Sequence, residues 1–103
     1  MEAIAQITTE RAQQYLRQLC RHFAHKVPAA CDEHQGQVQF ASGRCALSAD
    51  EQTLHLYLQA DDPAALEQLK EIVGRHLLRF AFREPLTLNW QAPSEEHPGA
   101  ASC

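Results

Sequence analysis

Two histidines, His22 and His25, are the first side chains in this 103-residue sequence whose spacing suits metal binding. A helix would place them within roughly 60° of each other on one flank, so both imidazoles could ligate one divalent ion such as iron. A third ligand would have to come from elsewhere, and the candidates are Cys31, Asp32, His34 and His76. Because Cys20 would lie on the opposite flank, we expect His22 and His25, and not Cys20, to ligate any metal that binds.

Another interpretation of this histidine pair is a solvated helix end that binds nothing. Protonated histidines near the C-terminus of a helix are stabilised by the helix dipole. This is the commoner role of two histidines beside basic residues, so the metal-binding prediction is conditional. The residue types also leave open which metal, iron or another divalent ion, would bind.

His76 belongs to the second stretch whose residues could do chemistry. It falls within the apolar arc of a predicted helix, which is formed by Leu66, Leu69, Val73, Leu77 and Phe80. A buried imidazole needs a hydrogen-bond partner, which is more often a backbone carbonyl or a carboxylate than a ligand. Charged side chains lie close by in the sequence, however, and with one lysine they form a predicted ligand-binding set: His76, Arg79, Arg83, Glu84 and Lys26.

Basic side chains are concentrated on the two predicted helices, although the chain as a whole is acidic. Nine Lys and Arg against thirteen Asp and Glu give a net charge of -4, which argues against a nucleic-acid partner. Most of the nine lie on the helices or just after the second one, among them Arg11, Arg17, Arg21, Lys26, Arg75, Arg79 and Arg83. They could form a local cationic patch that binds an anion, or a solvated face that offsets the helix dipoles.

Cysteine and glycine spacing excludes several classes of protein. The cysteines lack a C-x-x-C pair, which excludes a cysteine-based zinc knuckle and favours reduced thiols at Cys20, Cys31, Cys45 and Cys103. The glycines form neither a P-loop nor a dinucleotide-binding motif, and no serine lies in a nucleophile elbow. We assign no catalytic residue and expect a protein that is not an enzyme, although a Cys–His pair formed in the fold is left open.

Two amphipathic helices are predicted from the spacing of apolar residues. The first runs from Glu10 to about Lys26, and Thr8 or Thr9 would cap its start. The second begins at Pro63, after an aspartate that can accept from the first turn, and ends near residue 80.

Short strands fill the rest of the domain. Apolar and polar residues alternate in most of these stretches, which are residues 2–7, 27–31, 38–40, 44–49, 54–59 and 85–91. The resulting order, β-α-β-β-β-β-α-β, predicts an α+β fold: a two-layer sandwich with a mainly antiparallel sheet and both helices on one face. A TATA-binding-protein-like arrangement is the specific fold that this order fits best.

The composition of the chain predicts one domain over residues 1–91. Residues 92–103 hold two prolines, a glycine and no large apolar side chain, so we expect a disordered tail there. No apolar run approaches the roughly 20 residues of a membrane helix. Glu2 stands where a secretory signal would carry a basic residue. We therefore expect a cytoplasmic protein without a membrane partner.

Two segments resemble one bacterial family, the domain of unknown function 2218. They are L-C-R-H-F-A-H-K-V-P at 19–28 and V-G-R-H-L-L-R-F-A-F-R-E at 73–84, and the resemblance extends over residues 3–91. It implies a setting in iron acquisition, because relatives occur alone and as extra domains of siderophore-interacting flavin reductases. The positions that match the family's motifs, to which the resemblance assigns no role, are Cys20, His22, His25, Lys26, His76, Arg79, Arg83 and Glu84.

These observations favour a small cytoplasmic binding module that holds a metal or an anionic ferric chelate near the helix ends. The alternative is a non-catalytic interaction domain that docks on a siderophore reductase or forms a homodimer, with structural histidines and arginines. A small metal-dependent enzyme is the least favoured hypothesis.

Overall fold

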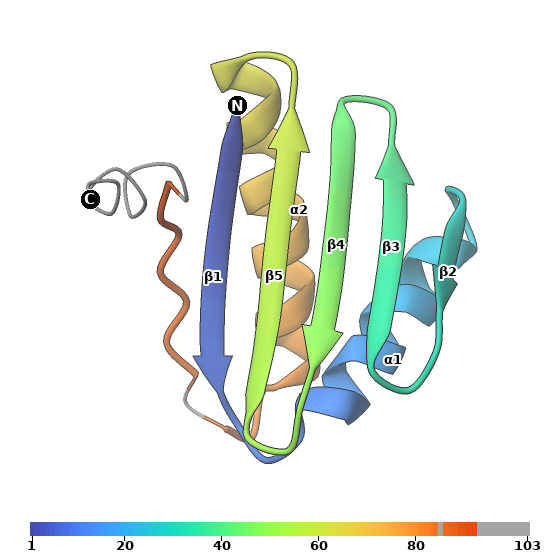
Figure 1. Cartoon of the computed structure of the whole chain (residues 1–103), viewed down its shortest axis with the longest axis vertical. Helices are drawn as coiled ribbons and strands as arrows, with labels where there is room; N and C mark the ends of the chain where they lie inside the picture. Colours follow the sequence, from blue (N-terminus) through green and yellow to red (C-terminus); the bar gives the residue numbers. More distant parts are fainter. Residues whose placement is uncertain (85, 93–103) are drawn as a thin grey trace, which may run out of the picture.

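Five antiparallel strands form one sheet, and two helices cover one of its faces (Figure 1). The computed structural model describes residues 1–84 and 86–92. In chain order the elements are β1 (Glu2–Thr8), α1 (Ala12–Ala24), β2 (Ala29–Cys31), β3 (Gln35–Phe40), β4 (Gly43–Ala49), β5 (Thr53–Ala60) and α2 (Pro63–Phe80). Neighbouring strands follow the order β1-β5-β4-β3-β2. The predicted two-layer α+β fold is confirmed.

Alternating side chains of the strands decide which face the helices cover. In β5, Leu54, Leu56 and Leu58 are buried, whereas the residues between them are only half-buried. The same alternation holds in β1 and β4, which flank β5 in register. Because every second strand residue is apolar, one face of the sheet packs against the helices and the other remains uncovered.

The first helix is shorter than predicted at both ends. It spans Ala12–Ala24, and its N-cap residue, Arg11, makes no capping bond with its side chain. The predicted cap, Thr9, is buried, and its hydroxyl accepts the backbone N–H of Arg11 at 3.1 Å instead of an amide of the first turn. The helix ends well before Pro28, whose ring disfavours a helical conformation in the preceding residue.

The second helix begins as predicted. The Asp62 carboxylate accepts the backbone N–H of Ala65 at 2.8 Å, and Pro63 occupies the first turn. The apolar arc of the helix faces the sheet, with Leu69, Val73 and Leu77 fully buried. No helix within residues 1–84 and 86–92 is long and apolar enough to cross a membrane.

The predicted last strand is an extended segment with a single bridge to the sheet. Ile4 and Gln91 exchange two backbone hydrogen bonds, of 2.7 and 2.8 Å, at the outer edge of β1. Packing, more than hydrogen bonding, holds this segment, since Leu88 lies against Gly74 of α2, where an added Cβ would approach it to 2.9 Å. Pro85 and most of the predicted tail, residues 93–103, lie outside the described residues.

The burial of α2 predicts how two leucines of the same helix respond to truncation. Leu69 is fully buried, so Leu69→Ala should lower the free energy of unfolding by about 2 to 5 kcal/mol. The matched control is Leu78→Ala, because Leu78 is 44% exposed, and we expect a change of about 0.5 kcal/mol or less. Urea denaturation at equilibrium measures both values. Equal losses would contradict the observed orientation of the helix.

Candidate functional site

The imidazole of His22 in α1 lies against that of His76 in α2. The two imidazole centroids lie 4.4 Å apart, with the ring planes tilted by 41°. Phenylalanine rings surround the pair edge-on, since His22 lies 5.3 Å from Phe23 and 5.8 Å from Phe80. The two histidines therefore form a contact between the helices, near the C-terminal end of each.

His76 has the backbone partner that its apolar surroundings require. Its Nδ1 lies 2.7 Å from the carbonyl oxygen of Ile72, one turn earlier in α2, and its ring is half-buried. Because a carbonyl can only accept, Nδ1 carries the proton and donates. In the neutral ring, Nε2 is therefore the nitrogen with a free lone pair. A backbone carbonyl was one of the two partners predicted for a structural His76.

Positive charge gathers around His22. Burial lowers the pKa of His22 below its usual value, and four basic neighbours lower it further: His76, Lys26, His25 and Arg79. We call these five residues the basic cluster: His22, His25, Lys26, His76 and Arg79. Neither Lys26 nor Arg79 forms an ion pair with another residue in the described part of the chain. The cluster therefore carries positive charge without a carboxylate partner.

The structure places Glu84 at the opposite end of α1 from the basic cluster. Its carboxylate accepts the Tyr15 hydroxyl at 2.6 Å and the Thr9 hydroxyl at 2.9 Å. These bonds, that of Tyr15 first, lower the pKa of Glu84. Tyr15 and His22 are roughly 10 Å apart along the helix axis, given a rise of about 1.5 Å per residue. Glu84 thus ties the chain after α2 to the start of α1.

Arg83 also has a partner of its own. Its guanidinium lies 5.2 Å from the ring centroid of Phe82, a side chain that is 75% exposed. Of the five predicted ligand-binding residues, the structure therefore gathers three, Lys26, His76 and Arg79, around His22.

Two imidazoles are too few for a resident metal ion. Among residues 1–84 and 86–92, no group of three or more His, Cys, Asp and Glu side chains is arranged to hold one. Of the predicted third ligands, Asp32 instead accepts the backbone N–H groups of His34 and Gln35 at 2.8 Å each. The His34 ring contacts the Gln13 amide at 3.1 Å. The donor set therefore does not fit a structural or catalytic metal site, which needs three or four protein ligands.

The uncovered face of the sheet carries a broad hollow that sequence analysis missed. It has a volume of about 690 Å³ and is lined by residues of all five strands, among them Ile4, Gln6, Ala30, Gln37, Ala46, Ser48, His55 and Tyr57. The only sequence signal is that most of these residues alternate with the buried residues of their strands. Such a pattern predicts solvent-exposed residues. It does not predict a hollow, because a hollow depends on how the strands twist together.

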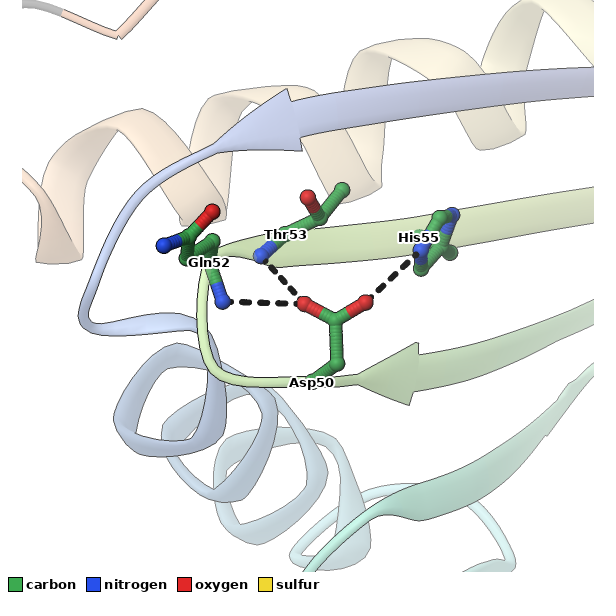
Figure 2. Close-up of polar contacts among 4 residues, drawn as sticks. All are labelled: Asp50, Gln52, Thr53 and His55. Atoms are coloured by element: carbon green, nitrogen blue, oxygen red, sulfur yellow. Dashed lines mark hydrogen bonds and ion pairs between the residues drawn. The ribbon is translucent and has the colours of Figure 1, made fainter.

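The turn between β4 and β5 is held together by Asp50 (Figure 2). One Asp50 oxygen accepts the backbone N–H groups of Gln52 at 2.9 Å and Thr53 at 2.7 Å, and the other lies 3.7 Å from His55 Nε2. The two backbone bonds lower the pKa of Asp50. Asp50 therefore serves first as a turn residue.

Comparison with known proteins gives a family and a structural relative. The family model described as an uncharacterized protein conserved in bacteria (DUF2218) matches residues 4–91. The chain is similar to the NMR structure of PA4090 from Pseudomonas aeruginosa, at 29% identity and a TM-score of 0.74, over 87% of this chain and 94% of that chain. No curated protein matches. The basic cluster lies within the matched residues.

The bonds of Glu84 predict a pH-dependent contribution to stability. Glu84→Gln should lower the free energy of unfolding by about 1 to 2 kcal/mol near neutral pH, since charge-assisted bonds to Thr9 and Tyr15 are weakened. A lowered pKa means that the contribution is complete above the unfolded value, about 4.3, and is lost as pH falls through the folded one. Denaturation at several pH values measures it.

The matched control for this prediction is Glu71→Gln. Glu71 makes only an exposed ion pair with Arg75, of 3.7 Å, so its loss should change stability by about 0.5 kcal/mol or less. A Glu84→Gln effect as small as that of the control, or one that grows toward low pH, would contradict the assigned role.

Proposed function

The chain belongs to the DUF2218 family of bacterial proteins, and we propose that it is a cytoplasmic, non-catalytic module that binds an anionic ferric chelate at the basic cluster. One observation carries this proposal. His22 and His76 lie in contact, and Lys26 and Arg79, which act on His22, form no ion pair in the described part of the chain. An anion placed there would offset the repulsion between these groups and accept hydrogen bonds from the Lys26 and Arg79 side chains.

The aromatic side chains beside the cluster support a ligand with an apolar part. The rings of Phe23 and Phe80 lie edge-on to His22, and Phe40 packs against Phe23 at 5.1 Å. Phe23 is buried, whereas the half-buried rings of Phe40 and Phe80 provide apolar surface near the charged groups. Organic iron chelates combine charged oxygen atoms with a carbon framework. Because only the imidazoles of His22 and His76 are in contact, and no group of three ligating side chains is arranged around one point in the described residues, we propose that the iron arrives already held by the chelate.

The setting in iron utilisation rests on the family resemblance, whereas the charge of the ligand rests on the cluster. A competing explanation for the cluster is the helix dipole, because basic side chains near two helix C-termini offset partial negative charge. That explanation requires no ligand. The two explanations differ in the effect of removing one basic side chain. If the cluster binds a ligand, the substitution weakens ligand binding; if the cluster only offsets the helix dipoles, it lowers helix stability alone.

Charge-neutralising substitutions test the proposal. Ferric citrate should bind the wild-type protein, and Arg79→Gln or Lys26→Gln should each weaken binding about tenfold, the equivalent of roughly 1.4 kcal/mol. Isothermal titration calorimetry measures the affinity, and a parallel titration with iron-free citrate separates recognition of the chelate from recognition of its carboxylates. Melting temperatures show whether each variant is folded.

Arg17→Gln is the matched control, because it removes the same charge from α1 but Arg17 is not among the groups that act on His22. It should leave the affinity within about twofold of wild type. That change corresponds to less than the roughly 0.5 kcal/mol typical of substitutions outside a site. Equal losses of affinity in Arg17→Gln and Arg79→Gln would show that the net charge of the protein, and not the basic cluster, determines binding. Absence of binding to the wild type would end the proposal.

The pKa of His22 predicts the direction of a pH dependence. A bound anion stabilises the protonated imidazole, so the affinity for ferric citrate should rise as pH falls through the lowered pKa of His22. His22→Gln should flatten this part of the profile while leaving any titration of citrate itself unchanged. A metal ion ligated directly by His22 would show the opposite trend, because it needs the neutral ring.

The alternative we propose is a non-catalytic interaction domain that docks on a siderophore reductase or forms a homodimer. It is favoured by the exposure of Phe82 and Leu78, at 75% and 44%, beside Arg79 and Arg83. Aromatic side chains and arginine are enriched in protein interfaces. Sedimentation of the full chain tests the homodimer: a monomer that binds ferric citrate contradicts it, and a dimer that binds none supports it. Sedimentation of an equimolar mixture with a siderophore reductase tests the docking in the same way.

A further inference from the structure

Two cysteines that are distant in sequence meet above one glycine. Cys20 lies in the second half of α1, and Cys31 ends β2, where it pairs in register with Gly36 of β3. A Cβ atom added to Gly36 would lie 2.8 Å from the Sγ atom of Cys20 and 2.9 Å from the Cβ atom of Cys31. Both side chains therefore border the same small space, which is free because residue 36 has no side chain.

The two thiols differ in their access to solvent. Cys31 is exposed, whereas Cys20 is buried beneath the helix. The Cys20 sulfur points toward β2, since it lies 4.0 Å from the carbonyl oxygen of Ala30, the neighbour of Cys31. Burial and the adjacent Cys31 thiol raise the pKa of Cys20 to about 12. A reagent in solution therefore reaches the Cys31 thiol before the buried Cys20 thiol.

We propose that Cys31 is a site of oxidation by hydrogen peroxide and that Cys20 resolves the product to an intrachain disulfide. In the first step the Cys31 thiolate sulfur attacks one peroxide oxygen. An S–O bond forms, the O–O bond breaks, and the leaving hydroxide takes up a proton to become water. Cys31 is then a sulfenic acid.

In the second step the Cys20 sulfur attacks the Cys31 sulfur. The S–S bond forms, the S–O bond breaks, and the leaving hydroxide takes the Cys20 proton as a second molecule of water. The two thiols together lose two electrons and two protons, and hydrogen peroxide accepts them.

The disulfide would close the segment that carries three members of the basic cluster. His22, His25 and Lys26 all lie between the two cysteines in sequence. Oxidation would thus join α1 to an edge strand of only three residues. The oxidation chemistry itself does not depend on what the basic cluster binds, so it can be tested without any ligand.

Peptide mapping of the full chain tests the proposal. Trypsin cleaves after Arg21, Lys26 and Arg44, so Cys20, Cys31 and Cys45 each fall in a different peptide. After reduction, treatment with hydrogen peroxide and blocking of free thiols with N-ethylmaleimide, mass spectrometry should identify the Cys20–Cys31 linked pair. Dithiothreitol should release both peptides.

Serine variants assign the role of each thiol. Cys31→Ser should lower the yield of intrachain disulfide at least tenfold, and because Cys31 is exposed, this variant should remain folded. Cys20→Ser should stop at the sulfenic acid of Cys31, which dimedone traps. The controls, Cys45→Ser and Cys103→Ser, should form the linked pair as the wild type does. Linkage of Cys20 to Cys45, or peroxide-treated wild type with Cys20 still free, would overturn the proposal.

Discussion

Burial of the alternate leucines of β5 is the constraint on which the rest of the structure depends. β5 pairs with β1 on one side and β4 on the other, and Leu54, Leu56 and Leu58 are each at most 1% exposed. A slip of one residue in its register would turn all three toward the uncovered face of the sheet. The register thereby also fixes which face receives α1 and α2, and so where the two helices meet.

The basic cluster is a consequence of the packing of α1 and α2 side by side on one face of the sheet. Leu19 and Phe23 of α1, and Val73 and Leu77 of α2, bury the apolar sides of the helices against the same sheet face. The side chains beside these apolar positions must then come together, and they include His22 and His76. Electrostatic repulsion between them is tolerated because the packing beneath is much larger in energy than a few partly solvated charges. A site of mutually repelling groups is stable here only because the core holds it together.

Local periodicity was sufficient to predict most of the fold, whereas contacts between distant segments were not predictable. The alternation in β5 and the Asp62-Pro63 start of α2 are properties of neighbouring residues, and the structure confirms both. The last strand was predicted from the same alternation, but a strand also needs a partner with free backbone groups, and residues 86–92 make one bridge only. His22 was paired with His25 because both lie on one helix. Its contact with His76 depends on how two helices pack.

The approach of Cys20 to Cys31 follows from the lengths of helix and strand between them. From Cys20 to His25 the helix advances roughly 7 Å, at about 1.5 Å per residue. The chain then turns back, with Lys26 and Val27 both donating to the Phe23 carbonyl. From Pro28 to Cys31 it returns roughly 10 Å, at about 3.3 Å per residue. The helical segment and the extended segment are thus similar in length, so Cys31 lies beside Cys20. His25 and Lys26 lie near the turn between the two segments. The same short connection therefore places the two thiols together and part of the basic cluster beside them.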